Sequence, residues 1–175
     1  MTNRQPTDVK NLDIYGNAPL EWNRAVELLD QFQKEGGWDA CFLGTVSPDG
    51  RPHSAGFGAS WYDGSIYFVS GAETRKSRNL AQNPACTISM RLKGMDLVLE
   101  GVASRVTDAE LLKKLAAVAR EAGWPAEVEG AAFTAPYSAP SAGPPPWNVY
   151  RFDFQTAFGV ASEEPHGATR WKFDN

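Results

Sequence analysis

The sequence predicts one mainly β domain, residues 1–175, in which a small closed or split barrel is flanked by about three helices. Three observations lead to this prediction. Short apolar segments alternate with tight-turn signals, other segments repeat apolar residues at helical spacing, and the chain contains no internal repeat or domain-splitting linker. A chain of this length can bury a sizeable core within a single domain.

The predicted barrel core covers about residues 40–107 as an antiparallel meander. Asp49-Gly50 and Asp63-Gly64 mark tight turns, because Asp-Gly pairs suit the backbone twist of short hairpin loops. A further turn is expected around Lys93-Gly94. The expected strands span residues 40–46, 51–62, 65–70, 85–92 and 97–106.

Helices are predicted before, within and after this core. The leading helix, residues 19–34, starts with a proline, which suits the first helical position. A second helix starts after Thr74, a good N-cap residue, and ends at Asn83-Pro84. A third helix, residues 107–122, opens with a capping box at residues 107–110.

The last third of the chain is predicted to close the barrel. Residues 123–146 lack regular periodicity and include three consecutive prolines, so they are expected to form a semi-rigid Pro-rich loop. Loops of this length often serve a function, and the alternative is a flap that covers an open barrel end. The closing strands, within residues 147–175, are expected at 147–154 and 156–161, joined tightly near Gln155, with an edge strand at the tail.

The second predicted strand is unusually rich in small residues, namely Ala55, Gly56, Gly58 and Ala59. Such residues pack weakly within a strand, so a ligand or another backbone is expected to approach closely. The alternative interpretation is a bulge at a barrel corner. Both explanations remain open at the level of the sequence.

Composition and charge exclude several functions. The net charge of −4 and a pI of about 5.2 argue against a general nucleic-acid surface. No run of about 18 apolar residues predicts a membrane span, and no metal-ligand spacing surrounds the two histidines. Two cysteines in apolar strands predict buried, reduced thiols and a cytoplasmic location.

Three cations stand at the predicted start of the second helix, namely Arg75, Lys76 and Arg78. A helix N-terminus carries partial positive charge, so each cation there costs about 0.3–1 kcal/mol unless an anion is present. A bound phosphate would reverse this effect, because N–H groups and fixed cations would converge on it. The segment therefore indicates either a phosphate clamp for a nucleotide-like cofactor or three solvated side chains on a surface helix.

Several of these segments, taken in order, resemble the FMN-binding split-barrel superfamily. This superfamily includes pyridoxamine 5′-phosphate oxidase and related flavin or deazaflavin oxidoreductases. The resemblance covers about residues 40–107 well, and the closing residues 169–173 also resemble the tails of relatives. It is carried by residues 42–53, 61–70, 74–80 and 83–84.

The resemblance implies a homodimer with two cofactor sites at the subunit interface. It assigns the cofactor phosphate to Thr74, Lys76, Arg78 and Asn79, with Arg75 as a further candidate. The second strand, around His53, Ser54, Ala55 and Gly56, would lie beside the flavin ring. Trp61 would pack near the ring, at the dimer seam or within the core.

Departures from the family pattern argue against vitamin B6 oxidation. The true oxidase carries an Arg and a Lys on the second strand, whereas residues 55–59 of this chain carry no charge. Its substrate-binding Arg and His near the C-terminus are not recognisable in residues 170–173. The Pro-rich loop lies outside the shared pattern.

No side chain is identified as catalytic, because no nucleophile or acid–base set is recognisable, and a flavin would carry the redox chemistry. The main hypothesis is an oxidoreductase that uses FMN. An 8-hydroxy-5-deazaflavin (coenzyme F420) is the alternative cofactor, and Arg51 and Arg91 are candidates for its anionic tail. A non-catalytic carrier or sensor of a flavin, or a structural barrel without cofactor, are the other hypotheses.

Overall fold

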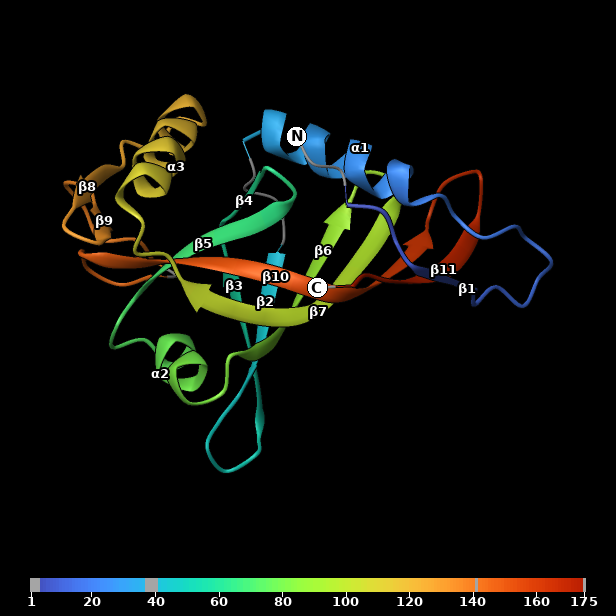
Figure 1. Cartoon of the computed structure of the whole chain (residues 1–175), viewed down its shortest axis with the longest axis horizontal. Coiled ribbons are helices and arrows are strands. Elements are labelled where there is room, and N and C mark those ends of the chain that lie inside the picture. Colours follow the sequence, from blue (N-terminus) through green and yellow to red (C-terminus); the bar gives the residue numbers. More distant parts are fainter. Residues whose placement is uncertain (1–3, 37–40, 141, 175) are drawn as a thin grey trace.

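The computed structural model describes residues 4–36, 41–140 and 142–174 (Figure 1). The fold is mainly β with three helices in the described ranges, as the sequence predicts. The helices are α1 (Trp22–Lys34), α2 (Arg75–Gln82) and α3 (Ala109–Glu121). The strands are β1 (Asp8–Asn11), β2 (Cys41–Val46), β3 (Pro52–Phe57), β4 (Ala59–Tyr62), β5 (Ser65–Gly71), β6 (Ala85–Leu92), β7 (Met95–Arg105), β8 (Glu127–Glu129), β9 (Ala132–Thr134), β10 (Trp147–Ala161) and β11 (Gly167–Lys172).

All strands belong to one antiparallel sheet that curls without closing. Its main path follows the order β1-β11-β10-β7-β6-β2-β3, and β10 also pairs with β5, which pairs with β4. The long strand β10 therefore belongs to both halves, because Tyr150 pairs with Phe68 on one side and with Arg105 on the other. The sheet adopts the open, split form of the predicted barrel.

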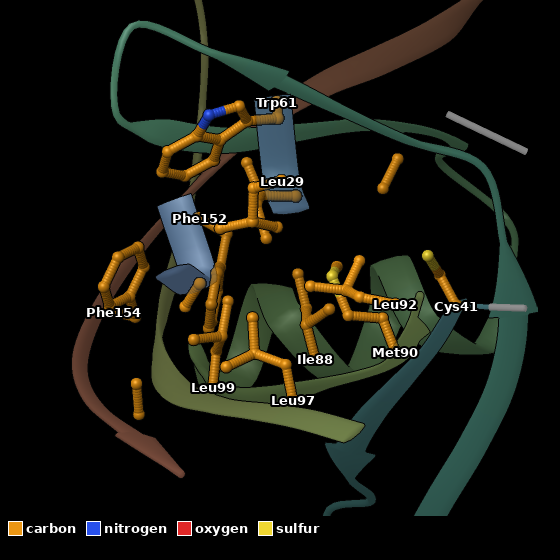
Figure 2. Packing of buried hydrophobic residues seen from close by; sticks show 14 of the residues in the cluster. Leu29, Cys41, Trp61, Ile88, Met90, Leu92, Leu97, Leu99, Phe152 and Phe154 are labelled. Atoms are coloured by element: carbon orange, nitrogen blue, oxygen red, sulfur yellow. The ribbon is translucent and has the colours of Figure 1, made fainter. Parts of the chain in front are cut away.

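The main core lies inside the curl of the sheet and under α1. Side chains of β2, β5, β6, β7 and β10 alternate between this interior and the outer face, as the two-residue period of a strand requires. Figure 2 shows Leu29 of α1 and Trp61 above the residues that point up from the sheet. The largest side chains with less than 2% exposure include Leu29, Ile88, Leu97, Leu99, Phe152 and Phe154.

A second core lies on the outer face of β5 and β10. Helix α3 and the short strands β8 and β9 cover this face at the left of Figure 1. Tyr67 and Val149 contribute from the sheet, Leu112 and Leu115 from α3, and Phe133 from β9. The segment predicted as an irregular Pro-rich loop thus contains a small hairpin that extends the sheet, and the loop prediction is wrong for residues 127–129 and 132–134.

The predicted strand at residues 51–62 is two strands that meet at Gly58. Before Gly58, β3 pairs with β2, since Phe57 lies opposite Cys41. After Gly58, β4 pairs with β5, since Ala59 lies opposite Phe68. The chain thus turns a corner of the barrel at Gly58, as one of the two interpretations of the small residues predicts.

The predicted tight connection near Gln155 is wrong, because β10 runs straight through this position. Gln155 is an extra residue in the ladder with β7, where the register shifts between Phe154 and Thr156. The close backbone approach requires Gly101 on β7, because a Cβ there would lie 2.2 Å from the Asp153 carbonyl oxygen. The bulge in β10 depends on a glycine in the neighbouring strand, whereas a hairpin turn would need turn residues within β10 itself.

The tail is not an edge strand, because β1 covers β11. All four residues of β1 are exposed, and Val9 is the only apolar residue among them, so no periodic pattern in the sequence indicated a strand. Trp171 of β11 is fully buried, and its Nε1 donates to the Leu20 carbonyl oxygen at 3.2 Å.

Two helix starts also differ from prediction. Helix α1 begins at Trp22 rather than at residue 19, with Glu21 as its N-cap residue. At α3 the N-cap is Asp108 rather than Thr107, since Asp108 Oδ1 accepts from the Leu111 backbone N at 2.7 Å. Thr107 and Asp108 are both good acceptors, and Asp108 is the one that caps the helix.

The longest helices of the described residues, α1 and α3, have 13 residues each, and none of the helices there meets the length and hydropathy of a membrane span. Cys41 and Cys86 are buried thiols, as predicted. The cytoplasmic location inferred from them stays a prediction.

Candidate functional site

The start of α2 is held by its own cap and by the end of β5. Thr74 is the N-cap residue, as predicted, and its Oγ1 accepts from the Ser77 backbone N at 3.3 Å. At the end of β5, the Gly71 backbone N donates to the Ala142 carbonyl oxygen at 2.8 Å. A Cβ on Gly71 would lie 2.6 Å from that same oxygen, so only glycine fits this junction.

Three hydroxyl groups connect the strand to the helix. Ser70 Oγ lies 2.6 Å from Thr74 Oγ1, and Ser77 Oγ donates to Ser70 Oγ at 2.8 Å. Thr74 Oγ1 also donates to the Gly71 carbonyl oxygen at 2.9 Å. This hydroxyl cluster, Ser70, Thr74 and Ser77, fixes the first turn of α2 against the sheet, so its N–H groups and side chains are preorganised.

The three cations of α2 have different surroundings. Lys76 is only 5% exposed, and burial lowers the pKa of its ammonium group. Arg75 extends to the β2–β3 turn, where its Nη2 donates to Ser47 Oγ at 3.0 Å. Arg78 is exposed. The helix therefore presents one buried cation, one anchored cation and one solvated cation.

His53 of β3 lies within electrostatic range of Arg75 and Lys76. Burial, then the charge of Arg75 and the charge of Lys76, lower the pKa of the His53 imidazole. The structure thus brings His53 and the start of α2 together, although 22 positions separate His53 from Arg75 in the chain. The local field is positive, as an anion site requires.

Asn79 lies in the interior, where its Nδ2 donates to Thr45 Oγ1 at 2.9 Å. Both residues are 3% exposed. Thr45 pairs with His53 across the β2–β3 ladder. Asn79 thus connects α2 to the strand beside His53, and its predicted contact with a cofactor stays a prediction.

The remaining predicted residues of β3 alternate between the two faces of the strand. Ser54 and Gly56 are exposed on the outer face, while His53 and Ala55 are half-buried on the inner face. A Cβ on Gly56 would meet no heavy atom within 4 Å. The outer face of β3 thus has free space beside its backbone, which suits the predicted close approach of a ligand or a partner.

Trp61 lies in the main core under α1, which is one of its three predicted locations. Its Nε1 donates to Asp30 Oδ1 at 2.9 Å, and its backbone N donates to Gln33 Oε1 at 2.8 Å. Trp61 pairs with Ile66, five positions before Gly71 on β5. About 17 Å of strand therefore separates it from the start of α2, and the structure does not bring the two together.

Sequence reasoning missed Ser47, Ser70 and Ser77, which hold the cations and the cap in place. The available signal was a hydroxyl residue at the end of β5 followed by hydroxyls four and seven positions later. Such serines are common at turns and helix starts, so this spacing alone does not indicate a site.

The chemistry of the site favours binding rather than acid–base or nucleophilic catalysis. Burial raises the pKa of the Cys86 thiol to about 12, so this cysteine remains protonated and unreactive. Within the described ranges, no group of three or more His, Cys, Asp or Glu residues is arranged to hold a metal ion. A capped helix start with a buried ammonium group and a nearby guanidinium group fits a phosphate.

Residues 30–161 match the family model described as "Pyridoxamine 5′-phosphate oxidase". The match extends from α1 to the end of β10 and includes the whole candidate site. Pyridoxine/pyridoxamine 5′-phosphate oxidase of Bacteroides thetaiotaomicron is 36% identical over 74 residues, which are 41% of this chain. The chain spans about a third (35%) of the length of that curated relative.

Solved structures share the fold at low sequence identity. A NimC/NimA family protein from Clostridium acetobutylicum aligns with a TM-score of 0.53 and 22% identity, covering 85% of this chain and 91% of that one. PhzG from Burkholderia lata, in complex with tetrahydrophenazine-1-carboxylic acid, gives 0.57 and 16%, covering 88% and 85%. An F420 reductase gives 0.50 and 18%, covering 72% and 94%. These similarities support the split-barrel fold.

Proposed function

Because the chain belongs to the pyridoxamine 5′-phosphate oxidase family, we propose that it is an oxidoreductase that binds FMN. It would transfer a hydride or electrons between FMN and a small organic substrate. The observation that carries this proposal is the start of α2, where a capped helix, a buried Lys76 and an anchored Arg75 meet beside His53.

The phosphate would bind to Thr74, Arg75 and Lys76, with Arg78 at the exposed side of the same turn. Bound FMN would supply the redox chemistry, as the family resemblance implies. The chain's own residues anchor the phosphate and orient the ring, which would lie along β3 beside His53, Ser54 and Ala55. Preorganisation by the hydroxyl cluster reduces the ordering that binding requires.

FMN is preferred to a deazaflavin because the two candidate arginines for an anionic tail already have carboxylate partners. Arg51 Nη2 lies 2.6 Å from Asp49 Oδ2, and Arg91 Nε lies 2.7 Å from Asp96 Oδ1. Arg91 also lies at the far end of β2 from His53, since its neighbour Met90 pairs with Cys41. Arg91 is therefore remote from the clamp, whereas Arg51 lies in the same turn as Ser47 but already pairs with Asp49.

The true vitamin B6 reaction is not proposed. The C-terminal Arg170 pairs with Asp8 of β1 at 2.5 Å, so this arginine joins two strands instead of facing a substrate. Residues 55–59 of β3 and β4 carry no charge. An uncharged organic substrate fits this surface better than a phosphorylated one.

We also propose a homodimer through the outer face of β2 and β3. Phe42 is 50% exposed there and lies between Gly56 of β3 and Ser89 of β6. Val46 is exposed farther along the same face. An exposed phenylalanine beside a bare glycine backbone favours a partner surface. Light scattering of the wild type and Phe42→Asp tests this, with a dimer expected only for the wild type.

Titration with FMN and with riboflavin tests the clamp, because riboflavin lacks the phosphate. Wild type is expected to bind FMN at least tenfold more tightly than riboflavin, and Arg75→Ala/Lys76→Ala is expected to lose this preference. Lys114→Ala, an exposed cation on α3, is the matched control. Equal affinity of the wild type for both flavins would refute the phosphate clamp.

Turnover distinguishes an oxidoreductase from a flavin carrier. The reduced, FMN-loaded protein is mixed with oxygen and with quinone, nitroaromatic and enone acceptors, and flavin absorbance is followed. Reoxidation faster than that of free reduced FMN supports the enzyme. Reduced flavin that persists with every acceptor supports the carrier.

A further inference from the structure

An apolar cavity of about 190 Å³ lies between α3, the outer face of β5 and the segment that follows α3. We call it the aromatic pocket. Its walls include Tyr67 and Val69 of β5, Leu115 and Ala119 of α3, Phe133 of β9 and Tyr137. It belongs to the second core and not to the site at α2.

The aromatic walls of the pocket are backed by rigidly held rings. Trp147 is fully buried, and its Nε1 donates to the Gly143 carbonyl oxygen at 2.8 Å. The Trp147 ring lies 5.5 Å from the Trp124 ring and 6.4 Å from the Tyr137 ring, measured between centroids. The Trp124 and Phe133 centroids are 6.0 Å apart. Rings held in this way offer edges and faces to a further ring at ordinary packing distances.

The pocket opens to solvent at an aromatic rim. Tyr137 is 43% exposed and Trp124 is half-buried, and both line the cavity. Protein interiors normally close around voids of this size, because lining atoms without neighbours lose dispersion contacts. Large rings at the mouth of an apolar cavity that none of the described side chains fills therefore indicate a ligand site rather than a packing defect.

The lining defines the chemistry of that ligand. None of the described residues of the lining carries a charge, so an ionic ligand would lose its hydration without compensation. The volume suits one or two fused rings, since an apolar cavity of about 150 Å³ binds benzene. Ser60 and Tyr137 of the lining also carry hydroxyl groups, whereas the Tyr67 hydroxyl interacts with the Ser65 side chain.

We propose that the aromatic pocket binds a small uncharged compound of one or two rings. It is chemically the opposite of the site at α2, although both sites use β5: Val69 lines the pocket, while the next residue, Ser70, belongs to the hydroxyl cluster on the other side. The inference does not depend on the proposed function, because no residue of the phosphate clamp lines the pocket.

Calorimetric titration of the full-length protein with indole, without added flavin, tests the proposal. Indole is a neutral bicyclic ring, and indole-2-carboxylate is its anionic analogue. Saturable binding of one indole per chain is expected, with at least tenfold weaker binding of the carboxylate. Absence of saturable binding, or equal affinity for the two compounds, would overturn the proposal.

Substitutions inside the pocket and at its rim locate the bound ring. Ala119→Leu adds volume inside the pocket and is expected to weaken indole binding at least tenfold. Ala117→Leu makes the same change on the same helix outside the lining and is the control.

If Ala119→Leu does not fold, Tyr137→Ala at the exposed rim is expected to weaken binding several-fold. Unchanged affinity in folded Ala119→Leu, or in Tyr137→Ala where that variant is used, would place the indole elsewhere. A chain that binds indole but not FMN would keep this inference and lose the proposed function.

Discussion

Helices α1 and α2 contact the same curled sheet from opposite sides but bury different kinds of side chain (Figure 1). The buried residues of α1 are Trp22, Ala25, Leu29 and Phe32, whereas those of α2 are Lys76, Ser77, Asn79 and Leu80. One helix therefore removes apolar surface from water, and the other buries an ammonium group, a hydroxyl and an amide.

The difference separates structural from functional burial. Apolar burial stabilises a fold by about 25 cal/mol for each Å². A buried lysine is instead destabilised by the loss of its hydration, and this loss lowers the pKa of Lys76. Ser77 and Asn79 donate to Ser70 and Thr45, so these two residues connect α2 to the sheet. The buried cation Lys76 is the residue of this set that the proposed phosphate would contact.

The largest effect is expected for Leu29→Ala on α1. Leu29 is fully buried against the sheet (Figure 2), so the truncation leaves a cavity and should lower the free energy of unfolding by about 2–5 kcal/mol. Urea denaturation measures the loss. Leu28→Ala, at a partly buried neighbour, is the control and should lose less. Equal losses would mean that α1 does not seal the core through Leu29.

Replacement of Lys76 by Met should have a smaller effect on stability and a large effect on FMN binding. Methionine has a similar length and lacks the charge whose burial lowers the pKa of Lys76, so the free energy of unfolding should fall less than it does for Leu29→Ala. FMN affinity should fall about 10–100-fold, since a hydrogen bond to a charged group contributes about 1.5–3 kcal/mol. Denaturation and FMN titration of the same variant measure both. A large loss of stability with unchanged FMN affinity would make Lys76 a structural residue.

The protonation of His53 should report on the occupant of the clamp. Its pKa is lowered in the folded chain, so the unfolded chain takes up this proton more readily. Stability from this group is therefore lost as the pH falls through 6.5, the ordinary value for histidine, towards the lowered pKa of the folded chain. A bound phosphate would offset the charges of Arg75 and Lys76, so the pKa of His53 should rise when FMN binds.

Proton NMR titration of the two histidine ring signals measures this change. The first residue of β10, Trp147, pairs with Gly71 beside α2, whereas His166 follows the opposite end of this strand. His166 is therefore remote from the clamp, and its signal serves as the reference. An unchanged His53 titration curve in the FMN-saturated protein would place the phosphate elsewhere.

The sequence was sufficient for those parts of the fold that depend on local patterns. The N-cap Thr74, the tight turns and the alternating strands follow from residues a few positions apart. It was insufficient where distant segments decide the outcome. Gln155 forms a bulge because Gly101 lies opposite, and β11 is an inner strand because the polar β1 pairs with it.

The candidate site shows the same division. The cations of α2 were recognisable because they stand together in the chain. Their different surroundings were not, since Ser47 and His53 reach Arg75 only through the β2–β3 hairpin. The burial of Lys76 likewise depends on how α2 packs against the sheet. The residue types alone thus predicted an anion site. The packing of α2 then distinguishes the three cations by their burial and their partners.

The smallest effect on stability is expected for Gly56→Ala on the outer face of β3. A Cβ at Gly56 would meet nothing within 4 Å, so the free energy of unfolding should change by less than about 0.5 kcal/mol. Gly101→Ala is the control, because its Cβ would clash with the Asp153 carbonyl oxygen and should destabilise by about 1–3 kcal/mol.

If a flavin ring or a partner chain lies against Gly56, the added methyl group should weaken FMN binding or dimerisation without affecting folding. FMN titration, light scattering and urea denaturation of both variants separate these effects. If Gly56→Ala leaves all three properties unchanged, this face of β3 does not contact a ligand or a partner, and its glycine has no role in the proposed site.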